Sequence, residues 1–172
     1  MESINETQKT DTEYRMYVLV LRQLNQMQKG IQAAHAVVEY INSNMEDIAV
    51  FGKEERQHSL VYTEQGRSLK QWMDVDKTLI LLDGGTCPEM VDNIMALYEC
   101  KVQYAKFVEP DLDNITTAIA FLASDKVWDK EKYPDHVGIL NQKLNAEHLK
   151  SLGLSEDEIS LREFIGSKHL AM

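Results

Sequence analysis

The stretch from Tyr17 to Tyr40, YVLVLRQLNQMQKGIQAAHAVVEY, constrains the fold more than any other part of the chain. It passes from an apolar strand pattern through a short polar turn into a helix whose first turns carry Lys29, Gln32 and His35. A helix that begins where a strand ends leaves backbone N–H groups pointing into a crevice. The stretch therefore predicts a place suited to an anion or a nucleotide.

The strand and the helix of this stretch have different apolar patterns. Residues Met16 to Leu21 are almost wholly apolar, which predicts a strand buried on both faces. From Gln26 to Asn42-Ser43-Asn44 apolar residues recur at helical spacing. The core side of this helix is expected to carry Met27, Ile31, Ala34, Val38 and Ile41. Its polar side is expected to carry Gln28, Gln32, His35 and Glu39.

Further elements follow along the chain. Residues 45 to 75 have a mixed pattern, with a helix expected at their start. The expected elements after them are a doubly buried strand Lys77–Leu82, a turn Asp83–Thr86, a helix from Thr86 to Cys100, and strands Val102–Val108 and Ile115–Leu122. The inward side of the helix is predicted to carry Met90, Val91, Ile94, Leu97 and Tyr98.

The order of these elements predicts an α/β fold, with a small mixed four-stranded sheet, helices on both of its faces and a C-terminal helical extension. Residues 1–14 are expected to be flexible, 15–124 to form the α/β domain and 125–172 to form the extension packed on it. Within the extension we expect a helix Val137–Leu152 stopped by Gly153. A second helix should begin with a capping box of Ser155 and Glu158 and close at Gly166.

Charge and cysteine positions narrow the classes of function. A net charge of -10 repels polyanions, so a small anionic ligand is favoured over a tRNA body. Cys87 and Cys100 lie at two ends of one expected helix, about 20 Å apart, and cannot form a disulfide. Together with the lack of an apolar run of about 20 residues, this predicts a cytoplasmic protein without a membrane segment.

The histidines give no sign of a metal site. His58, His136, His148 and His169 do not have the spacing of zinc ligands, and we predict neither a metal nor a cofactor.

Two sequence motifs resemble the type 2 peptidyl-tRNA hydrolases. The first is the strand LVLR, Leu19–Arg22, followed by a Met, a Lys-Gly pair and then Gln32-Ala33-Ala34-His35-Ala36. The second runs from Glu109-Pro110-Asp111 to Thr116-Thr117-Ala118-Ile119-Ala120 and resembles the last loop and strand of that family. The resemblance covers residues 15 to 122. It extends to the short members of the family found in bacteriophages. This implies that the protein is viral and acts in the host cytoplasm.

The resemblance implies that the protein is a hydrolase, and it also implies which residues act in catalysis and in substrate binding. One Lys29-Gly30 pair stands where the family has Gly-Lys-Gly-Lys, and the family's Asp-Ala-Gly-x-Thr signature is absent, so the acidic role moves to the 109–113 loop. The implied catalytic residues are Lys29, His35, Glu109 and Asp111. The implied substrate-binding residues are Gln28, Gln32, Asn114, Thr116 and Thr117.

Each of these residues also has an ordinary structural interpretation. His35 suits a hydrogen-bonded boundary position, and Glu109, Asp111 and Asp113 suit a solvated acidic turn. A carboxylate beside a lysine and a histidine would instead activate water, with Lys29 stabilising the developing negative charge.

Two classes of function remain open. The first is a hydrolase acting on a nucleotide. The net charge favours a cyclic dinucleotide phosphodiester as the substrate, and its cleavage would serve as a phage counter-defence. The alternative substrate is the ester of peptidyl-tRNA. The second is a protein that sequesters a nucleotide without cutting it. The acidic surface and the C-terminal helices leave room for a homodimer.

Overall fold

A four-stranded sheet forms the centre of the molecule. The computed structural model describes residues 12–51, 56–62, 64–136 and 142–172. The sheet has the order β4-β1-β6-β5 and consists of β1 (Tyr14–Val20), β4 (Thr78–Asp83), β5 (Tyr104–Glu109) and β6 (Ile115–Ser124). Strand β1 is parallel to β4 and antiparallel to β6, and β5 is antiparallel to β6. The predicted mixed sheet is therefore confirmed.

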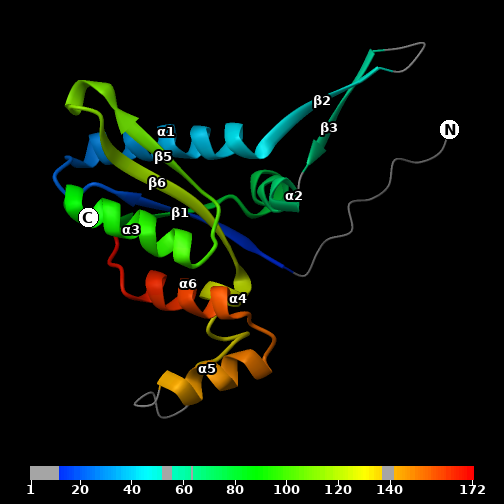
Figure 1. The fold of residues 1–172 in the computed structure, drawn as a ribbon, viewed down its shortest axis with the longest axis vertical. Helices are drawn as coiled ribbons and strands as arrows, with labels where there is room; N and C mark the ends of the chain where they lie inside the picture. The colour runs from blue at the N-terminus through cyan, green and yellow to red at the C-terminus, as the bar shows by residue number, and fades with distance from the viewer. Residues whose placement is uncertain (1–11, 52–55, 63, 137–141) are drawn as a thin grey trace.

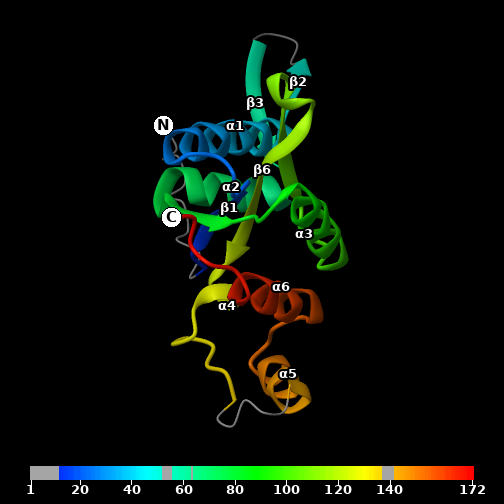
Figure 2. The same cartoon turned by 90° about the vertical axis from the view of Figure 1, so that its left-hand side faces the viewer.

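Helices cover both faces of this sheet, as predicted (Figure 1, Figure 2). One face packs against α1 (Gln26–Asn44), α2 (Glu64–Gln71) and the π-helical segment η1 (Trp72–Asp76). The other face packs against α3 (Cys87–Glu99) and α6 (Glu156–Gly166). Strand β1 lies inside the sheet, so its alternate side chains belong to the apolar clusters on both faces. Val18 lies on the α1 side, and Leu19 lies on the α3 side.

The predicted C-terminal extension is helical. The short helix α4 (Asp125–Trp128) follows β6, and α5 (Gln142–Ser151) packs against α6 through a separate apolar cluster centred on Leu149. Gly153 follows α5 and has a φ of +89°. This left-handed conformation suits its predicted role as the residue that ends the helix. The first residues of the predicted Val137–Leu152 helix, 137–141, lie outside the described residues, as does most of the 1–14 segment.

The prediction of a helix after residue 45 was wrong. Strands β2 (Met45–Phe51) and β3 (Arg56–Tyr62) pair antiparallel and project away from the sheet at the far end of α1 (Figure 1, Figure 2). The β-branched and aromatic residues Ile48, Val50 and Phe51 favour a strand here.

Strand β4 is half-buried rather than doubly buried. It is one of the two outer strands of the four-stranded sheet, and Leu79 is 46% exposed. An apolar run of this length is common to central and outer strands, so the pattern alone could not separate the two.

The prediction of the buried side of α1 was also wrong. Met27, Ile31 and Val38 are exposed, while the buried side carries Lys29, Gln32, Ala33, Ala36 and Tyr40. The alanines allow the helix to approach the sheet closely, and the polar side chains find partners there. The helix face predicted from hydrophobicity is therefore offset by about one residue from the face that packs on the sheet.

Helix α3 matches its prediction more closely. Met90 and Leu97 are buried as expected, although Val91 and Tyr98 are exposed. The predicted start is confirmed, because the Glu89 carboxylate accepts hydrogen bonds from the backbone N–H and the hydroxyl of Thr86. At the start of α6 the cap is reciprocal: the Ser155 N–H donates to the Glu158 carboxylate, and the Glu158 N–H donates to the Ser155 hydroxyl oxygen.

Two further observations concern the thiols and the helices. Cys87 and Cys100 are both free. Among the described residues, every helix is too short or too polar to cross a membrane.

The ionisation of Tyr40 on α1 should make the free energy of unfolding depend on pH. Burial raises the pKa of its hydroxyl to about 12, against a backbone hydrogen bond from Leu122 that lowers it. The unfolded chain loses this proton near pH 10, so unfolding becomes more favourable between pH 10 and 12. Over that window we expect Tyr40 to cost up to about 3 kcal/mol of stability.

Urea denaturation of the wild type and Tyr40→Phe at pH 8, 10 and 11.5 measures this effect. The free energy of unfolding should fall more steeply with pH in the wild type than in Tyr40→Phe, which cannot ionise. Equal slopes would show that Tyr40 is not buried against the sheet.

Candidate functional site

Three predicted residues from three elements meet in one hydrogen-bonded chain. Gln32 on α1 donates from Nε2 to Glu109 Oε2 at 2.6 Å. The Gln32 Oε1 accepts a hydrogen bond of 2.8 Å from the hydroxyl of Thr117 on β6. Gln32 is only 7% exposed and Thr117 is fully buried. We call this set the Gln32 relay.

The local sequence explains why these side chains can meet. Small residues on the helix, Ala33 and Ala36, share one buried cluster with Ala118 and Ala120 of β6, so little side-chain volume separates α1 from the sheet. The pairing of β5 with β6 shifts register beyond Phe107, and such irregularities redirect the side chains that follow. Glu109 lies after this shift, at the end of β5.

Lys29 lies one helical turn before Gln32 on the same buried side. It is 8% exposed, and its Nζ donates to the main-chain carbonyl of Met172 at 2.8 Å. A cation is disfavoured in the first turn of a helix because the dipole is positive there. The nearby carboxylate of Asp83 offsets this, since the charges of Lys29 and Asp83 act on each other.

His35 lies one turn after Gln32 and is exposed. Its ring stacks on Phe107 of β5, with 4.5 Å between ring centroids and 15° between planes. This pair forms an aromatic surface next to the Gln32 relay, because the Thr117 hydroxyl is also 3.5 Å from the Phe107 carbonyl.

Four other predicted residues lie outside the relay. Gln28 exchanges hydrogen bonds with Asn25 and caps the start of α1. Asp111, in the 3-10 turn η2 (Pro110–Leu112), and Asn114 are exposed in the loop between β5 and β6. Thr116 is half-buried and, by strand alternation, faces away from Thr117.

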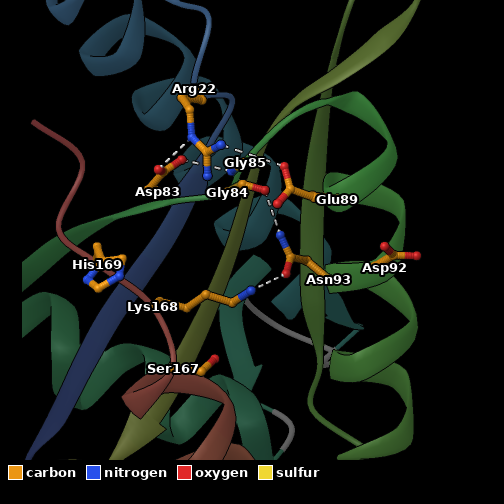
Figure 3. Close-up of a pocket in the computed structure, with 10 residues that line it drawn as sticks. All are labelled: Arg22, Asp83, Gly84, Gly85, Glu89, Asp92, Asn93, Ser167, Lys168 and His169. Carbon is orange, nitrogen blue, oxygen red and sulfur yellow. Dashed lines mark hydrogen bonds and ion pairs between the residues drawn. The ribbon is translucent and has the colours of Figure 1, made fainter.

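A polar cavity of about 260 Å³ lies between β4, α3 and the end of the chain (Figure 3). Arg22 reaches between two carboxylates, with Nε 2.8 Å from Asp83 and Nη1 3.9 Å from Glu89. On the lower wall Lys168 Nζ donates to Asn93 Oδ1 at 2.6 Å. The cavity lining is Arg22, Asp83, Gly84, Gly85, Glu89, Asp92, Asn93, Ser167, Lys168 and His169.

Three carboxylates and two cations line this cavity. Partial burial alone would raise the pKa of Asp83, but the Gly85 N–H, the Arg22 guanidinium and Lys29 together hold it below its usual range. Hydrogen bonds from Thr86 lower the pKa of Glu89. Burial lowers the pKa of Lys168. The acids therefore stay ionised, and the cavity suits a ligand that carries both donors and acceptors.

The sequence predicted an anion site at the start of α1, with an acidic residue of the 109–113 loop acting beside Lys29 and His35. The 260 Å³ cavity is instead lined by other residues. Arg22 and Asp83 could have been inferred, because each comes directly after one of two parallel strands, and such ends share a crevice. No sequence pattern predicted that Lys168 and His169 line the cavity. The contact of the chain end with β4 joins parts of the chain that are distant in sequence.

Neither the chemistry of the described residues nor the comparisons assign this site. No group of three or more metal-binding side chains occurs in the described part of the chain. No protein-family model matches the sequence, and no curated protein matches it. The functional argument therefore comes from the geometry and from the resemblance of the two motifs.

The Gln32 relay predicts coupled effects on stability. Gln32→Leu leaves the buried Thr117 hydroxyl without its main acceptor, and Thr117→Val leaves Gln32 Oε1 without a donor. Each change should lower the free energy of unfolding by about 1–3 kcal/mol. The double variant should be less destabilised than the sum of the two, by about 1 kcal/mol.

Urea titrations of the two single variants and the double variant measure this coupling. The matched control is Thr116→Val, the neighbouring threonine outside the relay, which should change stability by less than about 0.5 kcal/mol. Additive effects of the two relay substitutions would contradict the direct hydrogen bond.

Proposed function

We propose that the chain is a hydrolase acting on a nucleotide substrate, with a type 2 peptidyl-tRNA hydrolase-like site on α1, β5 and β6. The observation that carries the proposal is the Gln32 relay, which holds the Glu109 carboxylate at 2.6 Å while Lys29 lies one turn away on the same helix side. A carboxylate whose orientation is fixed by a buried amide is suited to taking a proton from water.

Each residue has a distinct role in the proposed reaction. Glu109 takes a proton from water as the water oxygen attacks the phosphorus of a phosphodiester. Lys29 stabilises the negative charge that develops on the phosphoryl oxygens. The ribose oxygen leaves as an alcohol after protonation by solvent. Gln32 is a positioning residue, because it fixes the orientation of the Glu109 carboxylate.

The aromatic pair next to the relay supports a nucleotide as the substrate. Bases stack on aromatic side chains, with about 1–3 kcal/mol per base. His35 is exposed and rests on Phe107, so a base can lie against its outer surface.

Net charge decides between a small and a large nucleotide substrate. A chain with a net charge of -10 repels the phosphates of a tRNA body, whereas a cyclic dinucleotide carries few phosphates. We therefore favour the cyclic dinucleotide phosphodiester, as a phage enzyme acting on host signalling nucleotides would require. Hydrolysis of the peptidyl-tRNA ester is the alternative substrate for the same residues.

A second candidate function is sequestration of a nucleotide without cleavage. Lys29 favours it, because this lysine is almost fully buried and already bonded to Met172, whereas a reacting group must be open to substrate. A bound nucleotide recovered unchanged after denaturation would identify this function.

Substitution of Lys29 and Glu109 separates catalysis from binding. Lys29→Met and Glu109→Gln should each lower kcat by about 10²–10³-fold, because each removes a group that acts on the transition state. Their affinity for the nucleotide should change much less. Chromatography of cyclic di-AMP and of peptidyl-tRNA after incubation measures the product, and calorimetry measures the affinity.

Lys106→Ala is the matched control. Lys106 is exposed on β5 and takes no part in the hydrogen bonds of the relay. This variant should keep wild-type turnover. Full activity of Glu109→Gln on both substrates would overturn the proposed catalytic role.

A further inference from the structure

The end of the chain extends the sheet beyond β4. The Asp83 N–H donates to the His169 carbonyl at 2.8 Å, and the Ala171 N–H donates to the Leu81 carbonyl at 3.0 Å. Leu170 pairs with Leu82 in an antiparallel bridge between these two bonds. Residues 169–172 thus lie along the free edge of β4 like a fifth strand. We call them the strap.

The strap ends on the proposed catalytic lysine. Its last carbonyl, that of Met172, accepts the hydrogen bond from Lys29 Nζ at 2.8 Å. Figures 1 and 2 show the red segment rising from α6 toward this side of the sheet. A segment 143 positions away in sequence therefore accepts a hydrogen bond from the ammonium group that a substrate phosphate would need.

The strap is held mainly through its backbone. Leu170 is 67% exposed and Met172 is 92% exposed, so their side chains contribute little burial. Only Ala171 packs against the α1 core. The residue before the strap is better anchored, because Lys168 bonds to Asn93 and lies 4.8 Å above the ring of Phe164. The strap can therefore lift while its base stays fixed.

The base of the strap also lines the cavity. Lys168 and His169 form one wall, opposite Arg22 and Asp83 (Figure 3). Asp83 interacts electrostatically with Lys29 and lies beside the strap, where its N–H donates to the His169 carbonyl.

We propose that the strap is a removable, autoinhibitory cover of Lys29 that competes with the nucleotide phosphate. The competition rests on the proposed function, whereas the covering of Lys29 does not. The Lys29 ammonium group donates to the main-chain oxygen of Met172, and a phosphate oxygen is an acceptor for the same ammonium group. Because the strap and the phosphate use the same Nζ, binding of one shifts the population of the other.

Ala171→Pro opens the strap with a single change. Proline has no N–H, so the bond to the Leu81 carbonyl is lost, and its ring disfavours pairing at this edge. Ala171→Ser is the matched control, because it keeps the N–H. Acetylation with acetic anhydride, followed by mass spectrometry, reports how open Lys29 is. Exposed Lys106 serves as the internal standard.

We expect Lys29 to be acetylated at least about five-fold faster in Ala171→Pro than in the wild type and in Ala171→Ser, with Lys106 unchanged. Equal Lys29 rates in the three proteins would overturn the proposal, whatever the substrate of the enzyme. A rise at Lys106 as well would indicate general unfolding and would also count against a local cover.

A reversible lock tests the competition. Leu82 and Leu170 form a non-hydrogen-bonded pair, the antiparallel pair with the closest Cα atoms, so Leu82→Cys with Leu170→Cys can form a disulfide. A Cys87→Ser background removes the nearest native thiol. The oxidised protein should lose cyclic di-AMP binding and turnover at least about ten-fold, and dithiothreitol should restore both.

The two readouts separate the two proposals. Faster acetylation of Lys29 together with the redox-dependent loss of binding supports both the cover and the competition. Faster acetylation with cyclic di-AMP binding that is unaffected by the lock keeps the cover but overturns the competition. Faster acetylation with no binding or turnover of cyclic di-AMP or peptidyl-tRNA in any variant overturns the proposed function and leaves the cover established.

Discussion

The close packing of α1 on the sheet determines where every candidate functional group lies. Ala33 and Ala36 bring the helix against Ala118 and Ala120, and in this narrow gap the amide of Gln32 is fully paired. A buried amide without partners would cost about 1–3 kcal/mol, so the relay favours one rotation of the helix. That rotation places Lys29 one turn before Gln32 and His35 one turn after it, and it leaves an apolar stripe of α1 exposed.

The same packing separates two polar regions. On the β5 side, the relay presents the Glu109 carboxylate next to the aromatic pair. On the β4 side, Arg22, Asp83 and the end of the chain surround a polar cavity. Lys29 interacts with Asp83 and with the strap, so its contacts belong to the β4 side.

Local patterns predicted the elements well and the site only in part. The apolar runs, the cap at Thr86 and the capping box at Ser155 act within a few residues, so sequence was sufficient for β1, α3 and α6. The face of α1 was wrong because hydrophobicity favoured Ile31 and Val38, whereas the tertiary pairing of Gln32 decides the interface. The outer position of β4, and the return of the strap to it, depend on contacts between distant residues that no local pattern contains.

The central claim is that the buried side of α1 presents Lys29 to a nucleotide phosphate beside the Gln32 relay. A crystal structure of the full chain soaked with cyclic di-AMP tests it most directly. The account predicts a phosphate oxygen at about 3 Å from Lys29 Nζ, a base against His35, and the Met172 carbonyl displaced. A nucleotide bound elsewhere, with the bond from Lys29 to Met172 unchanged, would contradict it.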